Sequence, residues 1–178
     1  ISFYLLKVSK MISHLRVHSG FSVVDSTVRL NDLFAAAKDK NIAAIALTDV
    51  SNLFAVVKFY KQALKSGVKP IFGVELKIDT DFGVCDLVLL AENNDGYQNI
   101  VKLVSKAYQE AERFGSIPLI PKEWLKRDCL DGVICLNGGQ NGELGKAILQ
   151  QNKEAIKSVL NSYIEIFCKD NFVIEIHK

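Results

Sequence analysis

The sequence has no apolar run approaching the roughly 20 residues that a membrane-spanning helix needs, and its net charge is only +2 over 178 residues. This near balance gives no strong electrostatic bias toward nucleic acid. The opening ISFYLLK is too short and too poorly flanked for a secretory signal. The four cysteines are Cys85, Cys129, Cys135 and Cys168. They show no CxxC spacing, which argues against a zinc ribbon. A cytoplasmic protein with reduced thiols is the simplest account, with Cys85 and Cys135 buried inside apolar runs.

The hydrophobic content of 49% is enough for a sizeable core, and its periodicity indicates alternating strands and helices. Strands are predicted at 14–18, 42–47, 71–78, 84–91, 132–136 and 172–176. Helices are predicted to follow at about 30–40, 53–66, 96–110, 142–150 and 153–167, with a loop at 113–121. The strands at 71–78 and 84–91 are close enough to form a hairpin. The alternation predicts an α/β fold with a parallel sheet, either open or closed as a barrel.

Several local expectations follow from this assignment. Ser26 or Thr27 is expected to cap the first helix, which Asn41 closes. Asp49, at the end of a buried strand, is a candidate general base, although capping the next helix is the favoured interpretation. The core face of the second helix is expected to carry Leu53, Val57, Tyr60 and Leu64. The core stripe of the third helix is expected to carry Tyr97, Ile100, Val101, Val104 and Tyr108.

The stretch HLRVHSGFSVVDS, residues 14–26, carries the densest chemistry. Alternation predicts a strand that presents His14, Arg16 and His18 on one face. An HxH pair on a strand, with an aspartate such as Asp25 just beyond, suits a divalent metal, but here the middle position is Arg16, which has no lone pair to give one.

This stretch resembles the opening of the PHP (polymerase and histidinol phosphatase) domain, in the version at the N-terminus of bacterial DNA polymerase III alpha subunits. That pattern reads HLHVHSxYSLLDG. The resemblance continues through ALTDVSNLFAVVKFY, GVKPIFGVELKI, LLAENNDGYQNIVKLVSKAY, IPKEWL and LNGGQNGELG. It implies a distorted seven-stranded (βα) barrel of the PHP type, of which this chain supplies about six strands. Residues 13–178 would be a C-terminally truncated PHP domain, and residues 1–12 an upstream extension, since Met11 is a candidate natural start.

The resemblance also implies a set of metal ligands. His18, Asp25 and Glu75 match ligand types of metal-binding members, whereas Asp86 stands in place of a histidine. Arg16 and Val50 also stand where the family has histidines, and Gly139 replaces a cysteine. The favoured interpretation is a vestigial site in which Arg16 pairs with Asp25 or Glu75, with no cofactor expected. The alternative is a reduced site with one metal on His18, Asp25, Glu75 and Asp86. His14 matches no ligand position and is interpreted as a structural histidine.

The resemblance further implies that the parent protein is a DNA-directed DNA polymerase of DNA replication. Its catalytic residues would lie outside this chain. This part would be a non-catalytic module that binds the proofreading exonuclease subunit and braces the remainder of the polymerase, with DNA bound through the full-length protein. The rival hypotheses are a metal-dependent 3′–5′ exonuclease and a free-standing PHP phosphoesterase.

Two other features have simpler explanations than a binding site. The glycine-rich run from Gly138 to Gly145 fails both the P-loop and the GxGxxG spacing, so it predicts a tight turn into a helix. Tyr97 and Tyr108 fit a core or interface better than a base-stacking platform. Trp124, beside Lys122 and Lys126, is either an anchor for a partner or a partly buried core residue.

Overall fold

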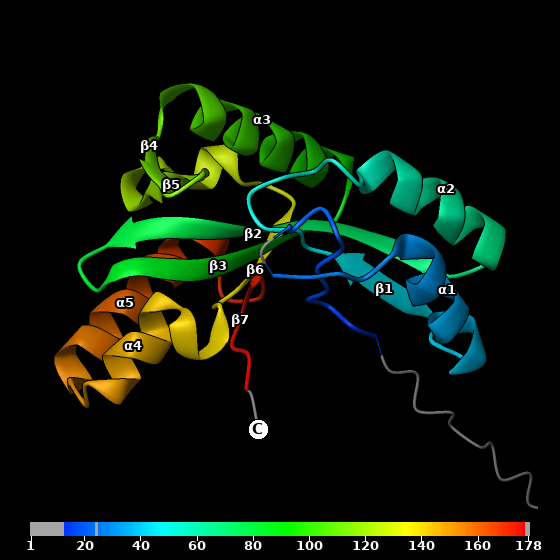
Figure 1. Cartoon of the computed structure of the whole chain (residues 1–178). Coiled ribbons are helices and arrows are strands. Elements are labelled where there is room, and N and C mark those ends of the chain that lie inside the picture. Colours follow the sequence, from blue (N-terminus) through cyan, green and yellow to red (C-terminus); the bar gives the residue numbers. More distant parts are fainter. Residues whose placement is uncertain (1–12, 24, 177–178) are drawn as a thin grey trace, which may run out of the picture.

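A computed structural model, which describes residues 13–23 and 25–176, shows a curved mixed sheet with helices on its outside (Figure 1). The strands are β1 (Ala44–Leu47), β2 (Lys69–Thr80), β3 (Gly83–Ala91), β4 (Glu112–Phe114), β5 (Ile117–Pro121), β6 (Val133–Leu136) and β7 (Phe172–Val173). The helices are α1 (Leu30–Asp39), α2 (Val56–Ser66), α3 (Asn94–Glu110), α4 (Glu143–Leu149) and α5 (Lys153–Phe167). The expected extension at 1–12 lies outside the described residues. None of the helices in the described part of the chain has both the length and the apolar content to cross a bilayer.

The α/β class is confirmed, but the sheet is mixed and not parallel. Its strands follow the order β4-β5-β2-β3-β6-β7, and β1 pairs with β2. The β1–β2, β2–β5 and β6–β7 pairs are parallel, whereas β2–β3, β3–β6 and β4–β5 are antiparallel. The predicted hairpin is responsible for the change, because it reverses the chain direction in the middle of the sheet.

The β2–β3 hairpin lies in the middle of the sheet, and its alternating side chains define the two faces of the sheet. Val74, Leu76 and Ile78 are fully buried in the main core, together with residues of α3 and α5. Because successive side chains of a strand point to opposite faces, Glu75 and Lys77 point to the other side. The sequence of β2 therefore places apolar packing on one face and charge on the other.

In the view of Figure 1, α3 lies above the hairpin, α4 and α5 lie below it, and α1 and α2 lie beside β1. The helices α3, α4 and α5 all contribute to the main core. A second core joins α1, α2 and β1, where the rings of Phe34 and Phe59 lie 5.2 Å apart. The predicted helices at 142–150 and 153–167 agree closely with α4 and α5. Cys85 and Cys135 are buried free thiols, as predicted.

The segment at 14–18 is extended but is not a strand. It makes a single bridge from His14 to Ile45, and the amide of Thr48 donates to the carbonyl of Val17. The segment lies along the outer edge of β1 without forming a regular ladder. Conversely, the stretch expected as a loop at 113–121 forms most of the β4–β5 pair. The part of the chain that the structure describes therefore contains seven strands, where about six were expected.

The expected core face of α2 is wrong. Val57, Tyr60 and Leu64 are 64%, 46% and 63% exposed, and the buried residues are Val56, Phe59 and Ala63. Both sets have helical spacing, so periodicity alone could not choose between them. On α3 the stripe is partly right, because Ile100 and Val104 are buried but Tyr108 is 37% exposed.

The expected caps of α1 and α2 are also wrong. Arg29 is at the N-cap of α1 and makes no side-chain cap. The Ser26 hydroxyl instead donates to the carbonyl of His18. Asp49 does not cap α2, which begins only at Val56.

Candidate functional site

A cluster of charged side chains lies on the polar face of the β2–β3 hairpin. Lys77 and Asp86 are directly paired across the two strands, and the Lys77 ammonium donates to Oδ1 of Asp86. The same ammonium lies 3.5 Å from Oε1 of Glu75, two residues earlier on β2. Because the Glu75 and Asp86 side chains are almost completely buried, these charges need partners within the protein.

Arg16 is the main partner of Glu75. Its Nε donates to Oε2 of Glu75 at 2.8 Å, and its Nη2 lies 2.8 Å from the same oxygen. Nη2 is also 3.4 Å from Oδ2 of Asp86, and Nη1 is 3.6 Å from Oε2 of Glu175. Of the two partners expected for Arg16, the structure selects Glu75. The contact with Glu175, just after β7, also links the 14–18 segment to the far end of the sheet.

His18 lies beside Arg16 and contacts two carboxylates. Its Nε2 is 2.9 Å from Oε2 of Glu75, and its Nδ1 contacts Oδ2 of Asp25. The hydrogen bond to Glu75 is the main reason that the pKa of His18 is raised above 6.5, and burial opposes it. For Glu75 itself, burial alone would raise the pKa. The hydrogen bond from His18 and the charges of Arg16, His18 and Lys77 outweigh burial and lower the pKa below 4.5.

The loop that carries His18 is held in place by Asp49. One carboxylate oxygen of Asp49 accepts from the amide of Ser19 at 2.6 Å and from the hydroxyl of Ser22 at 2.7 Å. The other oxygen accepts from the Ser19 hydroxyl at 2.7 Å. With three donors, this buried aspartate orders the 19–22 turn, and most of its acceptor capacity is already used. It is a poor general base in this arrangement.

At Val50 and Gly139, where the family has metal ligands, this chain contributes backbone atoms to the site and no ligating side chain. Val50 forms a bridge with Glu75, and the next amide, of Ser51, donates to the Glu75 carbonyl at 2.7 Å. Gly139 belongs to a tight turn before α4, as predicted for the glycine-rich run. Its neighbour Gly138 has φ 74°, and a Cβ there would overlap the backbone of Asp86. Only glycine allows this turn to pack so closely against the cluster.

Sequence reasoning missed Lys77 and Glu175. Lys77 had a usable signal, since it lies two residues after Glu75 on the same strand and must share its face. Glu175 had none, because its approach to Arg16 depends on the curvature of the whole sheet. His14, in contrast, has an exposed side chain, and its carbonyl accepts from the amide of Ala46.

The cluster does not fit a divalent metal ion as it is arranged here. Within residues 13–23 and 25–176, no three His, Cys, Asp or Glu side chains are grouped so that they could hold one. Arg16 and Lys77 donate to the carboxylate oxygens that a metal would need, and both ring nitrogens of His18 face carboxylates. Cations of the protein therefore occupy the place where a metal would have to bind.

Together, the fold and the cluster define an α/β domain that carries a compact group of ion pairs at the centre of its sheet. The chain belongs to the PHP domain family, whose model matches residues 14–178.

Proteins similar in sequence to this chain include alpha subunits of DNA polymerase III. The chain is 41% identical to that of Haemophilus influenzae over 170 residues, 93% of this chain and 14% of the relative. It is 36% identical to the subunit of Pseudomonas aeruginosa over 168 residues, with the same shares. It is also 36% identical to the subunit of Escherichia coli K12 over 167 residues, 92% of this chain and 14% of the relative. The chain thus spans about a seventh of the length of these relatives.

Two solved structures resemble this chain over part of its length. An amidohydrolase from Chromobacterium violaceum has a TM-score of 0.45 at 18% identity, covering 55% of this chain and 33% of that protein. A protein described as a metal-dependent phosphoesterase from Bifidobacterium adolescentis has a TM-score of 0.45 at 10% identity, covering 90% of this chain and 57% of that protein.

Proposed function

We propose that this chain is the N-terminal PHP portion of a DNA polymerase III alpha subunit, a cytoplasmic DNA-directed DNA polymerase of replication. The similarity over 93% of the chain to proteins of that name supports this proposal. Within that protein, the domain acts as a non-catalytic structural module. One observation carries this role: Arg16 and Lys77 neutralise the carboxylates that a catalytic metal would require.

The physical basis is the cost of burying carboxylates. Glu75 and Asp86 lie close together on neighbouring strands, and without cations their charges would repel and lose hydration. Arg16 presents several N–H donors in one rigid planar group, so it satisfies more than one oxygen at once. The cluster thereby fastens the 14–18 segment to the hairpin and to the end of β7.

The proposed partners are the proofreading exonuclease subunit and the remainder of the polymerase. The exposed apolar side chains of Val57, Tyr60 and Leu64 on α2 support a docking role. An exposed apolar stripe on one helix is a common feature of surfaces that bind other proteins.

The alternative function is a metal-dependent 3′–5′ exonuclease. It is favoured by the convergence of Asp25 and Glu75 on the two nitrogens of His18, since all three are metal-ligand types. A free-standing phosphoesterase would use the same residues. Either function would require a metal ion to displace Arg16 and Lys77 from the carboxylates.

The test uses the full-length protein and two measurements. Elemental analysis after dialysis should find no stoichiometric zinc or manganese, and the purified protein should not degrade single-stranded DNA. Bound metal together with nuclease activity would reject the structural role. Co-elution with the exonuclease subunit should weaken when Val57, Tyr60 and Leu64 are changed to serine, with Ile148→Ser on α4 as a control for an exposed apolar residue elsewhere.

A further inference from the structure

A basic groove lies beside the 19–22 turn, and no residue of the charged cluster lines it. It has a volume of about 490 Å³ and is formed by that turn, the start of α1 and one face of α2. Its lining residues are Ser19, Gly20, Phe21, Val28, Arg29, Leu30, Asn31, Lys58, Lys61, Gln62 and Lys65. The lining contains four cations and no carboxylate. A chain with a net charge of only +2 has therefore concentrated positive charge locally.

The cations are arranged in a row. Lys58, Lys61 and Lys65 fall at i, i+3 and i+7 of α2, so they share one stripe that is about 10 Å long. Arg29 faces them from the start of α1. All four are exposed, and among the described residues no ion pair joins any of them to an acid. Because α2 itself has no acidic residue, nothing on this helix offsets the charge.

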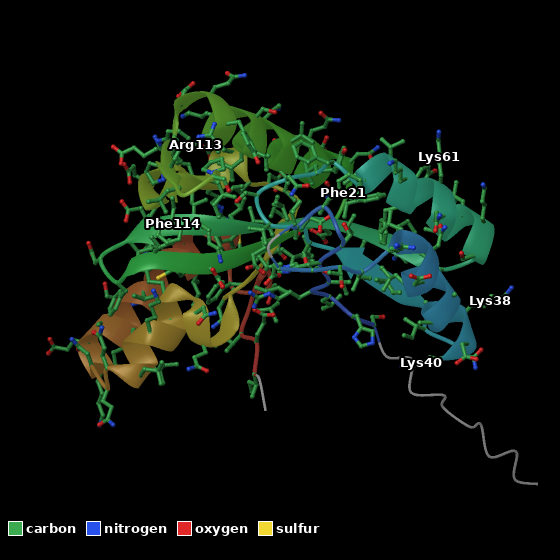
Figure 2. The ribbon with its side chains drawn as sticks, in the orientation of Figure 1. Phe21, Lys38, Lys40, Lys61, Arg113 and Phe114 are labelled. Atoms are coloured by element: carbon green, nitrogen blue, oxygen red, sulfur yellow. The ribbon has the colours of Figure 1, made fainter. Side chains whose placement is uncertain are left out.

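An aromatic ring stands at the edge of this row. Phe21 is 36% exposed, and the ammonium of Lys58 lies 5.3 Å from its ring centroid. Figure 2 shows Phe21 near the end of α2 that adjoins the turn, and Lys61 projecting from the same helix. Lys38 and Lys40 lie at the far end of α1 (Figure 2). The groove thus offers a flat apolar face next to a line of cations.

The groove is held in shape by the fold. Asp49 fixes the serines of the turn, and the amide of Gly20 donates to the carbonyl of Val28 at 2.8 Å. A hydrogen bond from Gln62 to Asn31 joins α2 to α1 across the groove. A preformed site loses little conformational freedom on binding, so the row of cations is ready for an extended anionic ligand.

We propose that this groove binds single-stranded DNA, with the phosphates along Lys58, Lys61 and Lys65 and a base against Phe21. A cationic groove that follows the backbone, combined with an aromatic ring for stacking, is the usual form of such sites. An acidic peptide would use the cations but has no aromatic base to place on Phe21. The choice of DNA over RNA rests on the proposed function, whereas the assignment to nucleic acid rests on the groove.

The first test measures anisotropy of a fluorescein-labelled oligothymidylate of about 12 nucleotides, a length within the range of known single-strand sites. With Arg29 as the fourth cation of the groove, four phosphate contacts predict a log–log salt slope near −2.8, so affinity should fall about 50-fold between ~50 and ~200 mM salt. The double variant Lys61→Gln and Lys65→Gln should lose at least about tenfold in affinity at low salt and have a slope near −1.4. Thermal unfolding of each variant shows whether it is folded.

Matched controls separate the groove from general charge. Lys38→Gln with Lys40→Gln removes the same charge outside the groove and should leave both affinity and slope unchanged. Phe21→Leu should weaken binding without changing the slope. Phe114→Leu, which alters an aromatic residue that is 52% exposed on β4, should have no effect. Equal losses in the two double-lysine variants would mean that bulk charge alone attracts the DNA, which would overturn the proposal.

A competition series tests the class of ligand. Polyglutamate that displaces the labelled DNA as well as unlabelled oligothymidylate does would overturn the nucleic-acid assignment. Tighter binding of oligouridylate would overturn the choice of DNA. In the full-length protein, photocrosslinking of a bromodeoxyuridine oligonucleotide should label peptides from residues 19–31 or 58–65. Crosslinks that never fall there would also overturn the proposal. None of these readouts depends on metal content or on the exonuclease subunit, so they can fail independently of the proposed function.

Discussion

Replacing Arg16 with alanine removes the central cation of the cluster and leaves its carboxylates in place. The change deletes two approaches of 2.8 Å to Glu75, together with the weaker contacts to Asp86 and Glu175. The Glu75 side chain is only 3% exposed, so water cannot replace the lost donors. Breaking a buried ion pair from one side typically costs about 3 to 5 kcal/mol.

The lower end of that range applies here. Arg16 is itself 22% exposed, which allows some solvent screening. Lys77 and His18 still contact Glu75 after the change, so its carboxylate retains part of its stabilisation. We therefore expect Arg16→Ala to lower the free energy of unfolding by about 3 kcal/mol.

The measurement is urea denaturation at neutral pH, on a protein that contains the complete domain. Arg113→Ala is the control, because this arginine is exposed on β4, makes long hydrogen bonds of 3.4 Å to backbone carbonyls and lies 5.2 Å from the centroid of the Tyr108 ring, without contacting a carboxylate among the described residues. It should change stability by less than about 0.5 kcal/mol. An Arg16→Ala protein as stable as the parent would refute the reasoning that a side-chain cation substitutes for metal.

Arg16→His tests the same reasoning through nuclease activity. It restores a metal-ligand type at this position, but Val50 and Gly139 still provide no side-chain ligand. We therefore expect no nuclease activity from this variant. Activity on single-stranded DNA would revive the exonuclease hypothesis.

Three further predictions concern pH, a second buried ion pair and association. Glu75 and Asp25 raise the pKa of His18, so protonated His18 stabilises the fold below pH 6.5. This stability should be lost as the pH rises through the folded-state pKa. Urea midpoints measured across this range should show the fall, and His18→Gln should abolish it. The buried Glu143 lies 2.8 Å from Lys122, so Glu143→Leu should destabilise by about 3 kcal/mol, and the double change with Lys122→Met should recover much of that loss in a double-mutant cycle. An apolar groove of about 850 Å³ and the exposed Ile176 should cause the isolated 178-residue chain to self-associate, whereas sedimentation of a compact monomer at high concentration would contradict this.

Local sequence patterns were sufficient for the parts of the fold that depend on neighbouring residues. The short turn between the strands at 71–78 and 84–91 predicted the central hairpin, and the glycines at 138–145 predicted the turn into α4. The two-residue spacing of Arg16 and His18 placed both beside Glu75, even though their segment lacks a regular ladder. The prediction for Arg16 and His18 holds because the direction of side chains follows directly from an extended backbone.

Tertiary packing decided what local pattern left open. On α2, two apolar stripes had equal helical spacing, and contact with the Phe34 ring selected the one that contains Phe59. The 113–121 stretch became most of a strand pair because β2 offers an edge beside β5, which no propensity within the stretch could reveal.

The charged sites depend on the same long-range assembly. Arg16 meets Glu75 across 59 residues of sequence, and Glu175 reaches it only because the sheet curves back on itself. The basic groove was hidden by a net charge of +2, since a sum over the chain says nothing about where folding places each charge. Residue types and local geometry are properties of the sequence, whereas the partners of a buried or clustered charge are set by which distant segments share one surface.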